Sequence, residues 1–322
     1  MKLREIYELA INLGKQKDIR GDYLQTILDD GVQKYEKLSE KEKESFDIES
    51  LKNPYADTRI LVGTGDEEIK MVFCGIDIET PEILLADRLR EKGHNIDLVI
   101  SHHPEGVAYA ALHDVMGVQA DMMENMGVPI NVGEGVMAPR IREVQRGIMP
   151  VNHQRSVDSA RLLDLPFLCV HSPADNLVND FLQNMFTSKE YSTLDDVIEM
   201  LLEIPEYDKG AKQKAGPRII AGKKELRAGK IFVKMTGGTS GSEKIYEKLS
   251  QAGVGTIICM HMPEKHIKLA KENQLNVIIA GHMASDSLGM NLFLDELEKK
   301  GITIIPGSGL IRVKRFANGD LH

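Results

Sequence analysis

From residue 58 onward, short apolar runs alternate with segments of helical periodicity, and this alternation limits the folds open to the chain. The expected strands are short and apolar, and they are TRILVG, IKMVFCGID, IDLVISHH, VPINV, FLCVH, KIFVKM, GTIICMH, NVIIAGH and ITIIPG. The segments between them, such as PEILLADRLREKG, have helical spacing, and several end in glycine, a common helix C-cap. Strands and helices in alternation form βαβ units. The sequence therefore predicts an α/β protein with mixed, largely parallel sheets.

The alternation is interrupted at residues 191–215, where a helical segment leads into a stretch rich in lysine, glycine and proline. Such a composition is typical of a connection between two lobes. We therefore expect a first α/β lobe over 56–190, a connection over 191–215 and a second α/β lobe over 216–322. Residues 1–55 are polar and dense in charge, which predicts an N-terminal helical arm.

The composition narrows the classes of function. No apolar run in the 322 residues approaches the roughly 20 that span a bilayer, and the N-terminus lacks the apolar core of a signal peptide. The three cysteines lie far apart, so neither a disulfide framework nor a thiolate zinc finger is expected. A net charge of −9 disfavours unspecific binding to nucleic acid. We expect a cytoplasmic protein with a small-molecule substrate and no membrane or nucleic-acid partner.

Four of the expected strands end directly in histidine. The histidines are His102 and His103, His171, His261 and His282. In open α/β sheets, ligands and catalytic groups gather beyond the carboxyl ends of the strands, where the connecting loops converge. We therefore expect these imidazoles to meet at one edge, although they are far apart in the sequence.

Two of these histidines are followed four positions later by an aspartate, as His171 by Asp175 and as His282 by Asp286. On a helix, that spacing places both groups on one face. Imidazole and carboxylate together suit Zn, Mn, Fe or Co better than Ca or Mg. The adjacent histidines before Pro104 would point to opposite faces of a strand, so the chain must bend there or serve two metal ions. The simpler alternative is that each histidine is a hydrogen-bonded structural residue.

The same residues carry a resemblance to the Nif-three-like family (NGG-one interacting factor three), also described as dinuclear metal centre hexameric proteins or GTP cyclohydrolase type 2 homologues. The matching segments are GIDIETPEILLADRL, IDLVISHHP, CVHSPADN and the stretch from TGGTSGSEK to AGHMASDSLGMN. They cover roughly half of the chain in the family's order. The pairing of HHP with AGH is rather specific to the family.

The family's metal ligands correspond to His102, His103, Asp175, His282 and Asp286 of this sequence. The resemblance implies two divalent metal ions per chain, held between the two lobes. It also implies a homo-oligomer, because the family forms hexameric rings. The family has glutamate in place of Asp286 and reads HTNLD where this chain reads HSPAD, and this chain is longer between His103 and Asp175. These departures indicate a distinct subfamily with an inserted segment in its first lobe.

Such a centre predicts metal-assisted hydrolysis. Two divalent ions that share a water lower its pKa and stabilise the oxyanion that forms after attack. We expect a hydrolase of the cyclohydrolase or phosphoesterase type, acting on a small, nucleotide-like substrate. The alternative is a non-catalytic metal-binding scaffold or a regulatory interaction protein, because the family's name derives from an interaction.

Residues near these ligands are candidates for proton transfer and orientation. Glu105 follows HHP and could hold or deprotonate the water, and the alternative is a solvated loop acid. His261 could contact the substrate, and the alternative is a structural imidazole. Asp77 could orient a ligand histidine or cap a helix. His113 and His153 lie in the inserted segment and are expected at the surface.

A glycine-rich loop, TGGTSGS, follows one expected strand and precedes an expected helix. Amide groups exposed at a helix N-terminus bind anions, so Gly237, Gly238, Ser240 and Gly241 are candidates for binding a substrate phosphate. The loop is neither a Walker loop nor a dinucleotide fingerprint. A tight turn between strand and helix would also explain its glycines.

Overall fold

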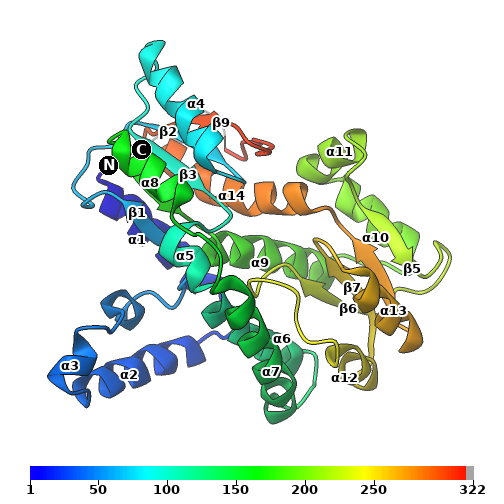
Figure 1. The fold of residues 1–322 in the computed structure, drawn as a ribbon. Coiled ribbons are helices and arrows are strands. Elements are labelled where there is room, and N and C mark those ends of the chain that lie inside the picture. The colour runs from blue at the N-terminus through cyan, green and yellow to red at the C-terminus, as the bar shows by residue number, and fades with distance from the viewer. Residues whose placement is uncertain (317–322) are drawn as a thin grey trace.

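The computed structural model describes residues 1–316 and has the expected mixed α/β fold, with two mainly parallel sheets (Figure 1). The first sheet has five strands in the order β1 (Arg59–Val62), β4 (Phe167–Cys169), β3 (Leu98–Ser101), β2 (Met71–Gly75) and β9 (Thr303–Pro306). The second has four strands in the order β5 (Arg218–Ala221), β8 (Asn276–Ile279), β7 (Val254–Cys259) and β6 (Lys230–Lys234).

The two sheets are built to the same plan. In each, an antiparallel edge strand lies beside the strand that leads into a long helix, β1 beside β4 and β5 beside β8. The remaining strands run parallel to β4 and to β8. Since parallel strands end at the same edge of their sheet, the histidines that follow them gather at one edge in each lobe.

Two long helices, α9 (Ser172–Ser188) and α14 (His282–Lys299), pack against each other and pass between the sheets (Figure 1). Helix α9 begins at the end of β4, and its later residues Val178, Leu182 and Phe186 pack in a core with the second sheet. Helix α14 begins after β8 and runs the other way, so that Phe293 and Leu294 pack in a core with the first sheet. The two helices therefore bring the strand ends of both lobes to a shared centre.

The remaining helices either pack on the faces of the sheets or form the N-terminal part of the chain. The apolar positions Leu3, Ile6 and Ala10 of the first helix are buried in the core of the first sheet, as their helical spacing on one face predicts. The helices are α1 (Leu3–Gln16), α2 (Tyr23–Glu36), α3 (Glu40–Lys43), η1 (Ile48–Leu51), α4 (Thr80–Glu91), α10 (Leu194–Leu202), α11 (Pro205–Lys212), α12 (Ile245–Gln251) and α13 (Glu264–Glu272).

The segment between β3 and β4 is wholly helical. Its elements are α5 (Gly106–Ala110), η2 (Leu112–Gly117), α6 (Val118–Asn125), α7 (Ile130–Ile148) and α8 (Arg155–Leu162). The expected strand VPINV is wrong, because α7 begins at Ile130 directly after Pro129. Proline has a backbone suited to a helix start and lacks only an N–H that the first turn leaves unpaired. Met122, Met123 and Met137 of this segment pack in a third core with the second sheet.

Three segments show how the chain is arranged around the two sheets. Helix α1, within the expected N-terminal arm, packs one face in the core of the first sheet. The expected connection contains α10 and α11, whose buried residues pack in the core of the second sheet. The chain then returns to the first sheet, where β9 pairs with β2. Within residues 1–316, no helix is both long and apolar enough to cross a membrane.

Candidate metal centre

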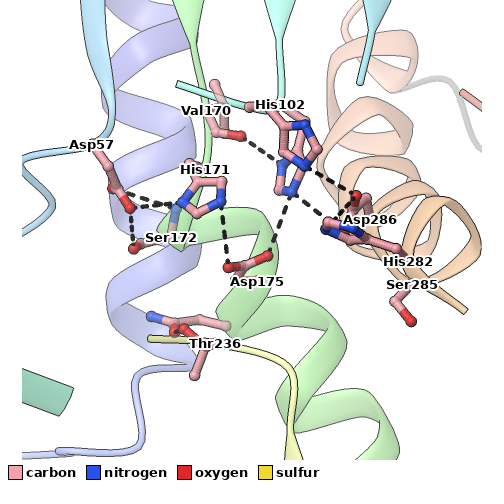
Figure 2. Close-up of polar contacts among 12 residues, drawn as sticks. Asp57, His102, Val170, His171, Ser172, Asp175, Thr236, His282, Ser285 and Asp286 are labelled. Carbon is pink, nitrogen blue, oxygen red and sulfur yellow. Dashed lines mark hydrogen bonds and ion pairs between the residues drawn. The ribbon is translucent and has the colours of Figure 1, made fainter. Parts of the chain in front are cut away.

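The expected metal ligands meet where the two lobes adjoin (Figure 2). The chain bends after β3, and the two backbone amides of His102 and His103 donate hydrogen bonds to the carbonyls of Gly75 and Ile76. The bend allows both imidazoles to face one centre, with their ring centroids 5.3 Å apart. Asp175 lies in the first turn of α9, one turn after His171, and Asp286 lies on α14 one turn after His282. The HxxxD pattern of the sequence therefore occupies equivalent places in the two lobes.

One group of ligand atoms comes from His102, His171 and Asp175, all buried. The Nε2 atom of His102 lies 3.5 Å from Oδ1 of Asp175. The Nε2 atom of His171 lies 3.8 Å from Oδ2 of the same carboxylate. These three side chains could hold a metal ion.

A second group comes from His102, His103 and Asp286, and shares His102 with the first. Oδ2 of Asp286 lies 3.4 Å from Nε2 of His103 and 3.4 Å from Nε2 of His282. Oδ1 of the same carboxylate lies 3.6 Å from Nε2 of His102. Figure 2 shows His102 between the two carboxylates, with His171 on one side and His282 on the other.

These separations fit metal coordination better than direct hydrogen bonding. An N–H···O hydrogen bond joins atoms about 2.7–3.2 Å apart. Two ligand atoms bonded to one ion at about 2.0–2.2 Å in a tetrahedral shell lie roughly 3.3–3.6 Å from each other. Oδ1 of Asp175 and both carboxylate oxygens of Asp286 are buried and receive no hydrogen bond from any described residue. Buried oxygens of this kind are costly unless an ion or proton satisfies them.

Three of the imidazoles are oriented by partners at Nδ1, which leaves Nε2 directed at the centre. His171 shares a 2.8 Å hydrogen bond with the buried carboxylate of Asp57, and His103 shares one of 2.6 Å with Asp77. The Nδ1 atom of His102 lies 3.1 Å from the carbonyl oxygen of Val170. Carboxylate and carbonyl partners of this kind fix the tautomer of a metal-binding histidine and raise its basicity.

The carboxylates strongly favour protonated imidazoles in the absence of a metal. Burial disfavours the charged form of His102, but Asp286 and Asp175 outweigh it and raise its pKa to about 10. Burial likewise opposes charge on His103, while Asp286 and Asp77 raise its pKa to about 9. Burial opposes charge on Asp286 too, but His102 and the neighbouring imidazoles lower its pKa. A divalent cation would replace these protons as the positive charge beside the acids.

A cavity of about 400 Å³ opens in front of these ligands. Glu105 and His261, the sequence-based candidates for proton transfer and substrate contact, both line this cavity. Burial raises the pKa of Glu105, whose carboxylate accepts a 2.7 Å hydrogen bond from Ser156. The ring centroids of His261 and His282 lie 4.9 Å apart, and burial lowers the pKa of both imidazoles.

The glycine-rich loop forms another wall of the cavity, through Gly238, Ser240 and neighbouring residues. The side-chain amide of Gln119 donates hydrogen bonds of 2.6 and 2.8 Å to the carbonyls of Gly237 and Thr239. Gly237 and Gly241 instead approach the Gln119 side chain and do not line the cavity. The next helix starts only at Ile245, so the loop amides are not the first turn of a helix.

Three residues at or beside the centre were not assigned to it in the sequence analysis. The sequence analysis named His171 as a histidine at a strand end and as half of an HxxxD pair, but it was left out of the ligand set because that set followed the family pattern. Asp57 precedes β1 and meets His171 only after 114 residues of chain, so no local pattern could reveal it. Lys234 ends β6 and lines the cavity, but within KIFVKM it reads as an ordinary strand residue.

The fold of the chain is shared with known structures. No protein-family model matches the sequence, and no curated protein matches it either. A NIF3 superfamily protein from Sphaerobacter thermophilus is 30% identical in sequence with a TM-score of 0.71, over 79% of this chain and 92% of that one. The reduced form of HcgD from Methanocaldococcus jannaschii is 16% identical with a TM-score of 0.51, over 83% and 94% of the two chains. The second likeness is one of fold alone.

Proposed function

The chain belongs to the NIF3 superfamily, and from this premise we propose that it is a metal-dependent hydrolase that acts on a small, nucleotide-like substrate through two divalent ions. One observation carries the proposal. The buried carboxylates of Asp175 and Asp286 have oxygens without hydrogen-bond donors, and imidazole Nε2 atoms face them at 3.4–3.8 Å. Such an arrangement has the chemistry and spacing of a metal centre.

We propose that the ions are held by His102, His103, Asp175, His282 and Asp286. The nearby imidazole of His171 belongs to one of the two candidate groups and is the natural addition to this set. Nitrogen and carboxylate donors favour Zn, Mn, Fe or Co over Ca and Mg. The side chain of Asp286 is one methylene shorter than that of the family's glutamate. Its buried carboxylate lies beside both His102 and His103.

When bound, the two ions would lower the pKa of a shared water and stabilise developing negative charge on the substrate. The chain's own residues would supply proton transfer and orientation. Glu105 borders the cavity, and burial raises the pKa of its carboxyl group, which suits a group that accepts and returns protons. His261 has a lowered pKa, so it would contact the substrate as a neutral imidazole.

We also propose that the protein works as a cytoplasmic homo-oligomer. Membership of the family supports a ring of chains, as the family resemblance implies. The net charge of −9 supports a small-molecule substrate over nucleic acid. Light scattering of the purified protein would give its mass, and a monomer at micromolar concentration would contradict the assembly.

The function is tested by turnover of the metal-loaded protein. Wild type, His102→Ala and Asp286→Ala would be assayed against nucleotides, phosphoesters and cyclic amides, with metal content measured on the same samples. We expect wild type to hydrolyse at least one class and both variants to lose metal and activity. The control His94→Ala changes an exposed histidine outside the cavity and should behave as wild type. Metal binding without turnover on the whole panel would instead support a non-catalytic scaffold.

A further inference from the structure

We propose that Lys234 binds a phosphate group of the substrate, so that the cavity takes a phosphorylated molecule with its phosphate directed towards the second lobe. This inference rests on the proposed function, because it assigns a substrate class to the same cavity. It concerns a residue that has no part in holding the ions.

The side chain of Lys234 has no polar partner among the described residues. It is the last residue of β6, it lines the cavity, and it is the only lysine or arginine among the lining residues. Its ammonium group forms no hydrogen bond and no ion pair with any residue of the described chain 1–316. Its strand neighbour in register is Cys259, which offers no charge to balance it. A basic group without a partner in a partly buried position favours an anion from outside the chain, which in turn favours its charged form.

The charges of the cavity are divided between its two walls. Apart from Asp175 and Asp286, which are proposed to hold the ions, the acids of the cavity line it from the first lobe (Asp77, Glu79 and Glu105), whereas Lys234 lines it from the second. An anionic group of a substrate would be repelled by the first wall and attracted by the second. The divided charge therefore fixes one orientation for a molecule that carries a phosphate at one end.

Additional donors lie next to Lys234 on the same wall. The hydroxyl groups of Thr239 and Ser240 line the cavity, and no described hydrogen bond uses them. The backbone amides of Gly238 and Ser240 likewise donate to no acceptor within the described residues. Gly238 has a φ of +77°, which brings the backbone to the cavity in a conformation that favours glycine. Several neutral donors around one cation suit the multiple oxygens of a phosphate.

The wall is also held in place without any ligand. The amide N–H of Met235, next to Lys234, donates a 3.0 Å hydrogen bond to the side chain of Asn179 on α9. The hydroxyl of Thr236 donates one of 2.8 Å to Asn176 on the same helix. Burial lowers the pKa of Lys234, with Cys259 and Asp175 acting in the opposite direction, and a bound phosphate would restore the charged form. The end of β6 that carries Lys234 is thus positioned relative to α9 before a substrate binds.

The test is calorimetric titration of inorganic phosphate into zinc-loaded protein, with zinc content measured on each sample. We expect Lys234→Met to weaken phosphate binding about tenfold or more while its zinc content stays at the wild-type value. Lys234→Arg keeps the charge and should remain within about threefold of wild type. The matched control Lys230→Met removes one exposed lysine at the other end of the same strand and should leave binding unchanged.

Equal phosphate affinity in wild type and Lys234→Met would overturn the inference, as would a wild type that binds no phosphate at millimolar concentration. Phosphate affinity is measured without turnover, so the role of Lys234 can be tested even if the protein is inactive on every substrate. The same titration on chelator-treated protein separates the lysine from the ions. A difference between wild type and Lys234→Met that persists there would support the lysine site even if no hydrolase activity exists.

Discussion

At the scale of single residues, the centre depends on imidazoles whose outer nitrogen is already engaged. Asp57 holds His171, Asp77 holds His103, and a backbone carbonyl holds His102. Each contact leaves Nε2 free for an ion and makes that nitrogen a better donor. The conformational entropy of these side chains is therefore lost during folding and not on metal binding.

Asp77→Asn should lower the affinity for zinc about tenfold. The asparagine keeps the shape of the side chain and an acceptor for His103, but it removes the negative charge that makes the imidazole more basic. Competition with a fluorescent chelator would measure the affinity. The control is Asp66→Asn, which changes an exposed carboxylate paired with Lys2. Equal zinc affinities for Asp77→Asn and wild type would show that the hydrogen bond does not assist binding.

The raised pKa values of His102 and His103 make metal binding dependent on pH. Both imidazoles are protonated at pH 7 in the metal-free protein, because their pKa values of about 10 and about 9 lie above that pH. A metal must displace these protons, so affinity should rise as the pH approaches 9 to 10 and binding at pH 7 should release protons. Calorimetry in two buffers of different ionisation enthalpy would count them. No proton release at pH 7 would contradict the assignment of these residues.

The same shifts affect the stability of the metal-free protein. Because the folded-state pKa values exceed the ordinary value of 6.5, protonation of these histidines stabilises the fold fully below pH 6.5. That contribution should be lost as the pH rises through about 9 to 10. Urea unfolding of chelator-treated protein across this range would measure the loss, and His103→Gln should reduce it. A free energy of unfolding that stays constant between pH 7 and 10 would count against the raised pKa values.

At this scale, histidines at the ends of apolar runs were the informative signal in the sequence. The five residues implied by the family resemblance meet in the structure, since parallel strands bring their carboxyl ends together. The sequence carries no local signal for the roles of Asp57 and Lys234, and the reason is physical. Their contacts depend on how β1 and β6 are placed by the tertiary fold, and neither lies in a motif that local spacing could identify.

At the scale of elements, the close packing of α9 against α14 sets the distance between the two HxxxD segments. Gly289 of α14 lies against the backbone of Ala174, the residue that precedes the candidate ligand Asp175. A Cβ atom at Gly289 would collide with the carbonyl oxygen of Ala174. The absence of a side chain therefore permits the approach that brings Asp175 and Asp286 to one centre.

Gly289→Ala should destabilise the protein by about 1–3 kcal/mol and weaken metal binding, because the helices must move apart. Gly135→Ala is the matched control, since it lies exposed in the interior of α7 with open space around it. That change should stabilise the protein by about 0.5–1 kcal/mol through helix propensity and leave metal binding unchanged. Urea unfolding measures both. A Gly289→Ala variant as stable as wild type would show that the helices tolerate a wider spacing.

Most strands can be predicted directly from their apolar runs, but the structure or placement of several elements depends on tertiary contacts. The run VPINV is part of a helix because Pro129 precedes a long amphipathic segment that packs on the second sheet. The edge strand β5 is not among the expected strands, because its apolar run is only three residues long and partly exposed. The last strand, β9, joins the first sheet because α14 carries the chain back across the molecule, and no local pattern reveals such a return.

At the scale of the whole molecule, the centre lies where both lobes contribute ligands. The first lobe provides the histidines after β3 and the start of α9, and the second provides the start of α14. An ion held there bridges both halves of the fold. Ligands that bind only the folded chain stabilise it in proportion to the logarithm of their concentration over Kd.

Zinc at a hundredfold excess over its Kd should therefore stabilise the wild type by about 2.7 kcal/mol. Thermal unfolding with and without a chelator would show the shift as a higher Tm for the whole molecule. His102→Ala should lose most of the shift because His102 belongs to both candidate groups. An identical shift in wild type and His102→Ala would place the stabilising ion elsewhere.

The central claim is that imidazoles and acids from both lobes hold two divalent ions in front of the cavity. Anomalous diffraction from crystals grown with zinc, recorded on both sides of the zinc absorption edge, tests this claim most directly. We predict two strong anomalous peaks per chain, enclosed by His102, His103, His171, Asp175, His282 and Asp286. The absence of peaks among these side chains, or zinc bound only at the protein surface, would contradict it.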